Sequence, residues 1–184
     1  MKLLIVVLLL LTATFAQDNL ARFVKAYKDK DMSLACSLGR QVYRSNVRDE
    51  KILIAAGHAC AEDDFIDFIG VLQQRLGSTA TSRRATVYFS TLLLKKRLIT
   101  EYMHEDVDLS PYTLPLTDHI LSKVFEAIKN KNFILIADTD PSKKGSKKHL
   151  RIGDTKDYID VYLQTKIYVD VYQEGKKIQE HRYR

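Results

Sequence analysis

Apolar residues recur every three or four positions along much of residues 19–103, which is the spacing of the buried face of an α-helix. Leu20, Phe23 and Tyr27 form the first such face, behind Asn19 as a helix-capping residue. Polar turns separate further runs of the same kind. The pattern predicts helices over residues 19–29, 31–44, 49–61 and 64–76, and a further helical hairpin within residues 82–103.

Two of these segments repeat one another. Residues 26–38 and 59–71 agree in kind when they are set 33 positions apart, so that Asp31 falls on Asp64, and a weaker third copy begins near Phe89. A period of about 33 is typical of stacked helical hairpins, none of which buries its apolar face alone. An irregular bundle of five or six helices is the alternative.

The repeat region resembles the tetratricopeptide (TPR-like and Sel1-like) helical repeats over about residues 19–104. The resemblance rests on the period, on polar turns such as Asp63-Asp64, and on small residues such as Ala56 where helices should meet. No proline closes a repeat, and Lys96-Arg97 stands where the third acidic cap should be. The resemblance implies a concave surface that binds peptides or proteins and carries no chemistry of its own.

The helical pattern stops after residue 104. Residues 105–116 contain two of the three prolines and no helical period, which predicts a linker, and residues 117–129 then show one more apolar helix face. We therefore expect four segments: a signal peptide over residues 1–16, a helical-hairpin region over 17–104, the linker over 105–116, and an α+β module over 117–184.

The last segment has the pattern of β-strands. Residues 133–137 form a continuous apolar run typical of a buried strand, and residues 149–152 suit a short one. Residues 158–172 alternate strictly, as one bent strand or as two broken near Gln164, and Glu174-Gly175 is a turn before an edge strand over 177–183. The predicted fold class is α+β: a helical-hairpin array followed by a small antiparallel sheet with one covering helix.

The amino terminus predicts export. Lys2 precedes the short apolar run Leu3–Leu11, and the small residue Ala16 suits a signal peptidase. We expect a cleaved signal peptide and a periplasmic or secreted protein, with an uncleaved membrane anchor as the alternative. No later segment is apolar enough to span a membrane, so we expect no transmembrane segment after cleavage.

Two cysteines fit an oxidising compartment. If helices 31–44 and 49–61 pack antiparallel, Cys36 lies within one helical turn of Cys60, so we expect a disulfide between them. Two buried thiols are the alternative. The chain holds 29 basic and 23 acidic residues, a formal net charge of +6. This excess is too small and too mixed to argue for nucleic acid.

Two groups of residues are candidates for binding a partner. Tyr158, Tyr162, Tyr168 and Tyr172 share one face of the alternating segment, beside lysine, and tyrosine is enriched at protein interfaces. Coverage by the helical half is the alternative for these tyrosines. A basic loop within residues 143–151 suits an acidic lipid, glycan or protein, or else is simply solvated. Its candidate binding residues are Lys143, Lys144, Lys147 and Lys148.

The sequence contains no strong catalytic motif. Asp138 and Asp140 end an apolar run and suggest a metal-assisted hydrolase, but a solvated turn, with Asp140 before Pro141, is the preferred interpretation. His104 with its acidic neighbours, and His58 with Cys60, are weaker metal candidates. We therefore expect no catalytic residue, no metal and no cofactor. The leading expectation is an exported protein–protein interaction or adaptor protein; the alternatives are the hydrolase and an envelope component that contacts acidic surfaces through the basic loop.

Overall fold

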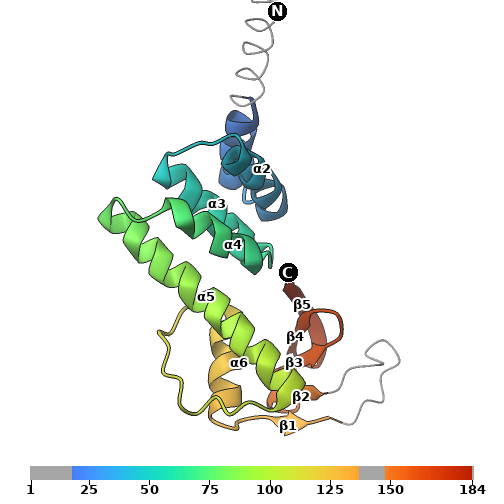
Figure 1. Ribbon diagram of the computed structural model, residues 1–184. Coiled ribbons are helices and arrows are strands. Elements are labelled where there is room, and N and C mark those ends of the chain that lie inside the picture. Colours follow the sequence, from blue (N-terminus) through green and yellow to red (C-terminus); the bar gives the residue numbers. More distant parts are fainter. Residues whose placement is uncertain (1–17, 137–147, 184) are drawn as a thin grey trace, which may run out of the picture. The chain divides into compact units, whose positions relative to one another are not determined.

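The computed structural model describes residues 18–136 and 148–183 of the chain. Within them helices come first and an antiparallel sheet follows, so the predicted α+β class is confirmed (Figure 1). The chain divides between Phe89 and Ser90, inside helix α5 (Ala80–Glu105), into two units. The domain boundaries expected from the sequence stay predictions. In the described ranges, no helix combines the length and the apolar character needed to cross a membrane.

The amino-terminal unit consists of helical hairpins. A helix over residues 18–28 is followed by α2 (Met32–Arg44), and α3 (Glu50–Glu62) is followed by α4 (Ile66–Leu72) and the short 3₁₀ helix η1 (Gln73–Arg75). Asp31 and Asp49 accept hydrogen bonds from the backbone N–H groups of Leu34 and Lys51 and so cap α2 and α3.

The turns of the two hairpins have the same geometry. Lys30 and Asp64 each have a φ of 59° and end the first helix of their hairpin in the left-handed conformation. In each turn the next residue donates its N–H to the carbonyl five positions back, at 3.0 Å in the first turn and 2.8 Å in the second. Since Lys30 and Asp64 lie 34 positions apart, the structural period is 34, one residue longer than the sequence alignment indicates.

A third hairpin does not form. Helix α5 runs without a break through Lys96 and Arg97, so the hairpin predicted within residues 82–103 is wrong. Lysine, arginine and the following Leu98 are good helix formers. Because no residue there takes a left-handed conformation, nothing ends the helix at the position that the repeat would require.

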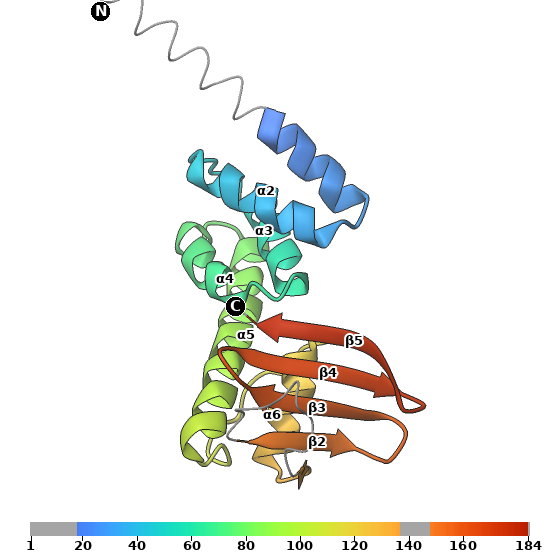
Figure 2. The ribbon, with the colours of Figure 1, turned by 90° about the vertical axis from the view of Figure 1, so that its right-hand side faces the viewer.

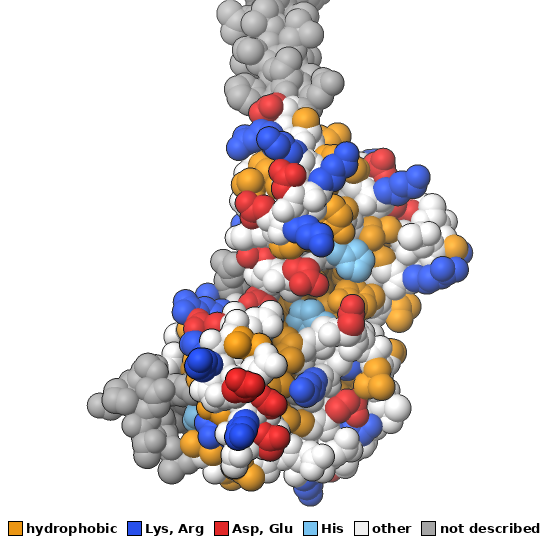
Figure 3. All heavy atoms as spheres, turned by 180° about the vertical axis from the view of Figure 1, so that it is seen from behind, with side chains coloured by type: hydrophobic (Ala, Val, Ile, Leu, Met, Phe, Trp, Pro, Cys, Tyr) orange, Lys and Arg blue, Asp and Glu red, His pale blue; other side chains and the backbone are white. Residues whose placement is uncertain are grey.

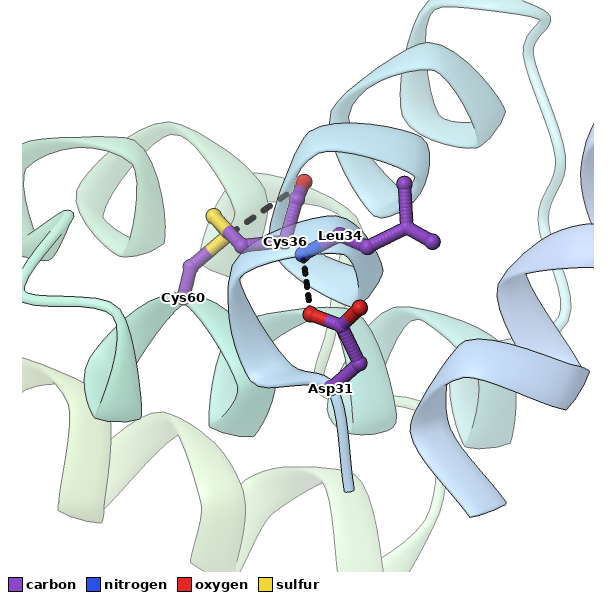
Figure 4. Close-up of a disulfide and its surroundings, with 4 residues drawn as sticks. All are labelled: Asp31, Leu34, Cys36 and Cys60. Atoms are coloured by element: carbon purple, nitrogen blue, oxygen red, sulfur yellow. Dashed lines mark hydrogen bonds between the residues drawn. A yellow bond between two sulfur atoms is a disulfide. The ribbon is translucent and has the colours of Figure 1, made fainter. Parts of the chain in front are cut away.

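Helices α2 and α3 pack closely and are joined covalently. A Cβ atom placed on Gly39 would lie 2.8 Å from Cβ of Ala56, so the missing side chain is what permits this approach. A disulfide joins Cys36 to Cys60, as the sequence predicts, and the Cα atoms of the two residues are 4.6 Å apart (Figure 4).

Glu50, in the first turn of α3, holds the loop before α5. Its carboxylate accepts hydrogen bonds from the backbone N–H groups of Gly77 and Ser78, both at 2.9 Å, and of Thr79 at 3.2 Å. Hydrogen bonds from Ser78 are the main cause that lowers the pKa of Glu50 from 4.5 to about 2. The ionised carboxylate therefore stabilises the folded state.

We expect Glu50→Gln to remove a pH-dependent part of the stability. A carboxyl group with a lowered folded-state pKa contributes stability that is present above pH 4.5 and is lost as the pH falls toward about 2. The thermal midpoint of the variant should lie below that of the wild type at pH 7, and the gap should narrow over this range. Glu62→Gln, at an exposed position of the same helix, is the control. Parallel midpoint curves for Glu50→Gln and the wild type would contradict the expectation.

The carboxy-terminal unit contains a five-stranded antiparallel sheet in simple chain order (Figure 2). Its strands are β1 (Ile134–Leu135), β2 (His149–Gly153), β3 (Tyr158–Leu163), β4 (Ile167–Gln173) and β5 (Lys176–Tyr183). The alternating segment is therefore two strands, joined at residues 164–166, which is one of the two readings that the sequence left open.

One face of this sheet is apolar and is covered by a helix. Leu150, Val161 and Val169 are buried on it, and α6 (Ile120–Lys129) buries Phe125 among its apolar residues. In Figure 2, α6 lies behind the sheet. The cap of α6 is His119, whose Nδ1 accepts the N–H of Leu121 at 3.2 Å.

Strand β1 differs from the sequence prediction of a buried strand. Ile134 is 59% exposed and Leu135 is 67% exposed, because this two-residue strand lies at the edge of the sheet and, among the described strands, pairs with β2 alone. A continuous apolar run predicts a buried strand only if the strand has a neighbouring strand on each side. An edge strand has a neighbour on one side alone.

Candidate functional site

The face of the sheet opposite α6 carries polar side chains in three rows across strands β2–β5. The pairing register defines these rows, since directly paired residues point to the same face. The surface that they form is called here the tyrosine face. Its middle row is Arg151, Asp160, Asp170 and Glu180; one outer row is Tyr158, Tyr172 and Lys177, and the other is His149, Tyr162, Tyr168 and Arg182.

The four tyrosines form two stacked pairs. The ring centroids of Tyr158 and Tyr172 are 4.4 Å apart with 14° between their planes, and those of Tyr162 and Tyr168 are 5.0 Å apart with 7°. These separations match the distance between neighbouring strands, so the ring faces are turned toward each other. The ring edges and hydroxyl groups of the partly exposed Tyr158, Tyr168 and Tyr172 are therefore the parts that a partner would meet, whereas Tyr162 is buried.

Between the tyrosine pairs lie two buried carboxylates. Asp160 and Asp170 are directly opposite each other on β3 and β4, and each is 1% exposed. Like charges placed directly opposite destabilise a sheet. The pair therefore depends on the cations and hydrogen-bond donors around it.

Arg151 and His149 surround Asp160. The guanidinium of Arg151 donates two hydrogen bonds to the carboxylate, at 2.8 and 3.0 Å, and lies 3.9 Å from the centre of the Tyr158 ring. Nε2 of His149 is 3.3 Å from Oδ2 of Asp160. The hydrogen bond to Asp160 raises the pKa of Arg151, so the guanidinium group stays charged at every relevant pH.

Asp170 has a different set of neighbours. The hydroxyl of Tyr162 donates a hydrogen bond of 3.4 Å to it, and the ammonium group of Lys177 lies 3.6 Å away. Burial, together with the charge of Asp170, raises the pKa values of both Tyr162 and Tyr172. These hydroxyls consequently remain protonated hydrogen-bond donors at neutral and mildly alkaline pH.

The charges that solvent reaches on the tyrosine face are mainly basic. The side chains of Arg182 and Lys177 are 65% and 42% exposed, whereas those of Asp160 and Asp170 are 2% exposed. Three bases and three acids make the rows formally neutral. Asp160 and Asp170 are buried, whereas the side chain of Glu180 is 27% exposed and pairs with both Lys177 and Arg182. Elsewhere the charges are mixed, with basic and acidic side chains interspersed over the view in Figure 3.

The predicted site residues fall into three groups. The structure brings together the four tyrosines on one face, as the alternation indicates. Lys148 lies instead at the end of α5, where its ammonium group donates to the carbonyl of Tyr102 at 2.6 Å and pairs with Asp106. The other predicted residues lie outside the described part of the chain: Lys143, Lys144 and Lys147 of the basic loop, and Asp138 and Asp140 of the hydrolase alternative.

Sequence reasoning did not single out the residues that hold the tyrosine face together. Asp160 and Asp170 occupy the same alternate positions as the tyrosines, so the pattern placed them on this face without marking them as buried. Nothing in the pattern pairs Arg151 with Asp160, because they are on different strands and nine positions apart.

A serine and a lysine form a separate polar cluster in the same unit. Nζ of Lys95 donates to Oγ of Ser122 at 2.7 Å and to the carbonyl of Pro115 at 2.8 Å. Serine–lysine pairs act as nucleophile and base in some hydrolases. Here both side chains are buried, and Oγ of Ser122 also accepts the N–H of Thr117 at 3.1 Å. We assign the cluster a structural role: it anchors the segment before α6 to α5.

The structure does not support the two weaker metal candidates, His104 with its acidic neighbours and His58 with Cys60. The described residues contain no group of three histidine, cysteine or acidic side chains able to hold a metal ion. Cys60 is in the disulfide, so it serves neither as a thiolate ligand beside His58 nor as a nucleophile. Comparison of the chain with protein-family models, with curated proteins and with solved structures gives no match.

Proposed function

We propose that this chain is an exported protein–protein interaction or adaptor protein that binds a partner protein through the tyrosine face. The observation that supports the proposal is the composition of that face. Tyrosine and arginine are the residue types most enriched among those that dominate binding energy at interfaces. Here four tyrosines, Arg151 and Arg182 lie on one side of a sheet whose other side is occupied by α6.

The stacked arrangement favours binding for a second reason. A rigid side chain loses little conformational freedom on association. The tyrosine rings hold one another in place, and Arg151 packs on Tyr158, so the surface is already ordered before a partner arrives.

Two features support export. Disulfides persist in oxidising compartments and are rare in the cytosol. The Cys36–Cys60 bridge therefore agrees with a signal peptide over residues 1–16 and with a periplasmic or secreted location. The signal peptide lies outside the described residues.

The amino-terminal unit offers a second contact surface in this proposal. Its two hairpin turns recur at 34 positions, which is the period of tetratricopeptide repeats. This period supports the proposed likeness to TPR-like repeats, and peptide or protein binding is what such arrays commonly do. The exposed surfaces of the helices near residues 19–29, 49–61 and 82–95 are the candidates.

A photo-crosslinking experiment tests the tyrosine face directly. A photoreactive phenylalanine analogue is placed at Arg182, or at the exposed control position Thr155, in the full-length chain expressed in its native envelope. We expect one defined protein adduct from position 182 and none from position 155. Adding Tyr168→Ala and Tyr172→Ala should reduce that adduct about tenfold or more, as the loss of interface anchors does. Adducts of equal yield from both positions, or none from position 182, would refute the proposal.

A further inference from the structure

A pocket of about 560 Å³ lies at the edge of the sheet, between the carboxy-terminal end of α6 and strand β2. Ala127 and Ile152 are buried residues of its lining, with Phe133 beside them. Its rim carries the polar groups Lys123, Glu126, Asn130, Lys131 and Asn132. Pockets of this size suit small ligands or a few residues of a peptide.

The turn after α6 is the reason that this place stays open. Lys131 takes a left-handed conformation with a φ of 57°, and the N–H of Asn132 donates to the carbonyl of Ala127 at 2.7 Å. Asn132 is therefore hydrogen-bonded to α6 and does not pair with β2. Pairing starts only at Ile134 with Arg151, so β1 ends short of Gly153.

The backbone of β2 faces this opening at Gly153. In an antiparallel ladder, every second residue directs its N–H and C=O toward the same neighbouring strand. The N–H of Ile136 donates to the carbonyl of His149 at 2.9 Å, so His149, Arg151 and Gly153 point toward the β1 side. Because β1 does not reach Gly153, the N–H of that residue is directed toward the side of the sheet where the pocket lies, while its φ of 116° takes its own carbonyl out of the regular ladder.

The charges at the rim favour a carboxylate. Lys123 and Lys131 are exposed, Glu126 is the acidic residue of the lining, and Lys131 also interacts electrostatically with Asp108. The guanidinium of Arg151 is committed to Asp160, so this residue adds mainly backbone to the pocket. The carbonyls at the end of α6 already accept hydrogen bonds from Asn130, Lys131 and Asn132, which reduces their repulsion of an anion.

We propose that this pocket binds the carboxy-terminal residues of a peptide. The final apolar side chain would lie on Ala127 and Ile152, the last peptide group would bond to the backbone of Gly153, and the terminal carboxylate would pair with Lys123 and Lys131. Extended peptides commonly bind in this way, along the free edge of a strand beside a helix. The proposal does not rest on the tyrosine face, and its ligand differs from the folded partner proposed there.

The probes that test this are acetyl-Gly-Leu-Val with a free carboxylate and the same tripeptide with a terminal amide. Each is titrated into the isotope-labelled full-length chain, and amide resonances are followed by NMR. We expect the free acid to shift resonances of residues 123–134 and 151–153. The amide should bind about tenfold or more weakly, since it lacks a charge-assisted contact.

Two variants make the outcome specific. Lys123→Gln with Lys131→Gln should weaken the free acid about tenfold and leave the amide unchanged, because only the acid offers a negative charge. Lys129→Gln, in the last turn of the same helix but outside the lining, is the matched control. Equal affinities for acid and amide, shifts confined to the tyrosine face, or no shifts at millimolar peptide would each overturn the proposal.

Discussion

Replacing both Cys36 and Cys60 by alanine is expected to lower the free energy of unfolding of the amino-terminal unit by about 3 kcal/mol. The bridge closes a loop with a sequence separation of 24 residues. Removing it releases the unfolded chain to sample far more conformations, which is the main source of disulfide stabilisation in the loop-entropy account. Both cysteines are buried, so the small volume lost on going to alanine adds to the effect.

Denaturant unfolding followed by circular dichroism measures this loss. The reduced wild type serves as a control, because it loses the bridge while it keeps every side chain. We expect the reduced wild type and the double variant to unfold at similar, lower denaturant concentrations than the oxidised wild type. Equal midpoints for all three samples would show that the bridge contributes nothing to stability.

Gly57→Ala is expected to destabilise the same unit by about 2 kcal/mol through overpacking. A Cβ atom at position 57 would lie 2.6 Å from Cε2 of Phe89, whose side chain is fully buried and has little room to move. Helix propensity acts in the opposite direction, since alanine is favoured over glycine by about 1 kcal/mol inside a helix. A loss of stability therefore identifies the close contact as the cause.

A double-mutant cycle isolates that contact. Phe89→Leu removes the ring atoms that a new Cβ would meet, so Gly57→Ala should become neutral or stabilising in this background. Thermal or denaturant unfolding of the four proteins gives the coupling energy. If Gly57→Ala costs the same with phenylalanine or leucine at position 89, the contact with the ring is not what requires glycine.

Some of the candidate site was visible in the sequence because a strand has a fixed period. Alternation places Tyr158, Tyr162, Tyr168 and Tyr172 on one face whatever the strands pair with. Pairing register is different, since it depends on which strands meet and where. Only the register sets Asp160 against Asp170 and brings Arg151 to Asp160, and these contacts turn a stripe of tyrosines into an ordered surface.

Helix-capping residues in the sequence predicted the starts of the helices well. The prediction was wrong where no capping residue was present. Acidic or polar caps stand before α2 and α3, and both begin where the sequence indicates. At Lys96 and Arg97, where the repeat predicts a turn between two helices, the sequence has no helix-capping residue, and α5 continues through both positions. The repeat alone was therefore a poorer guide than the chemistry of the turn, because a helix ends only where its backbone groups find other partners.

The sequence by itself determined the α+β class, the order of helices before strands, the connected cysteine pair and the residues that share the tyrosine face. These depend on short-range periodicity and on residue types that act within a few positions. Only the tertiary structure decided that Ile134 and Leu135 lie at an exposed edge, that Asp160 and Asp170 are buried against each other, and that a pocket opens beside Gly153. Burial and pairing depend on neighbours that are distant in sequence, and no local pattern specifies those neighbours.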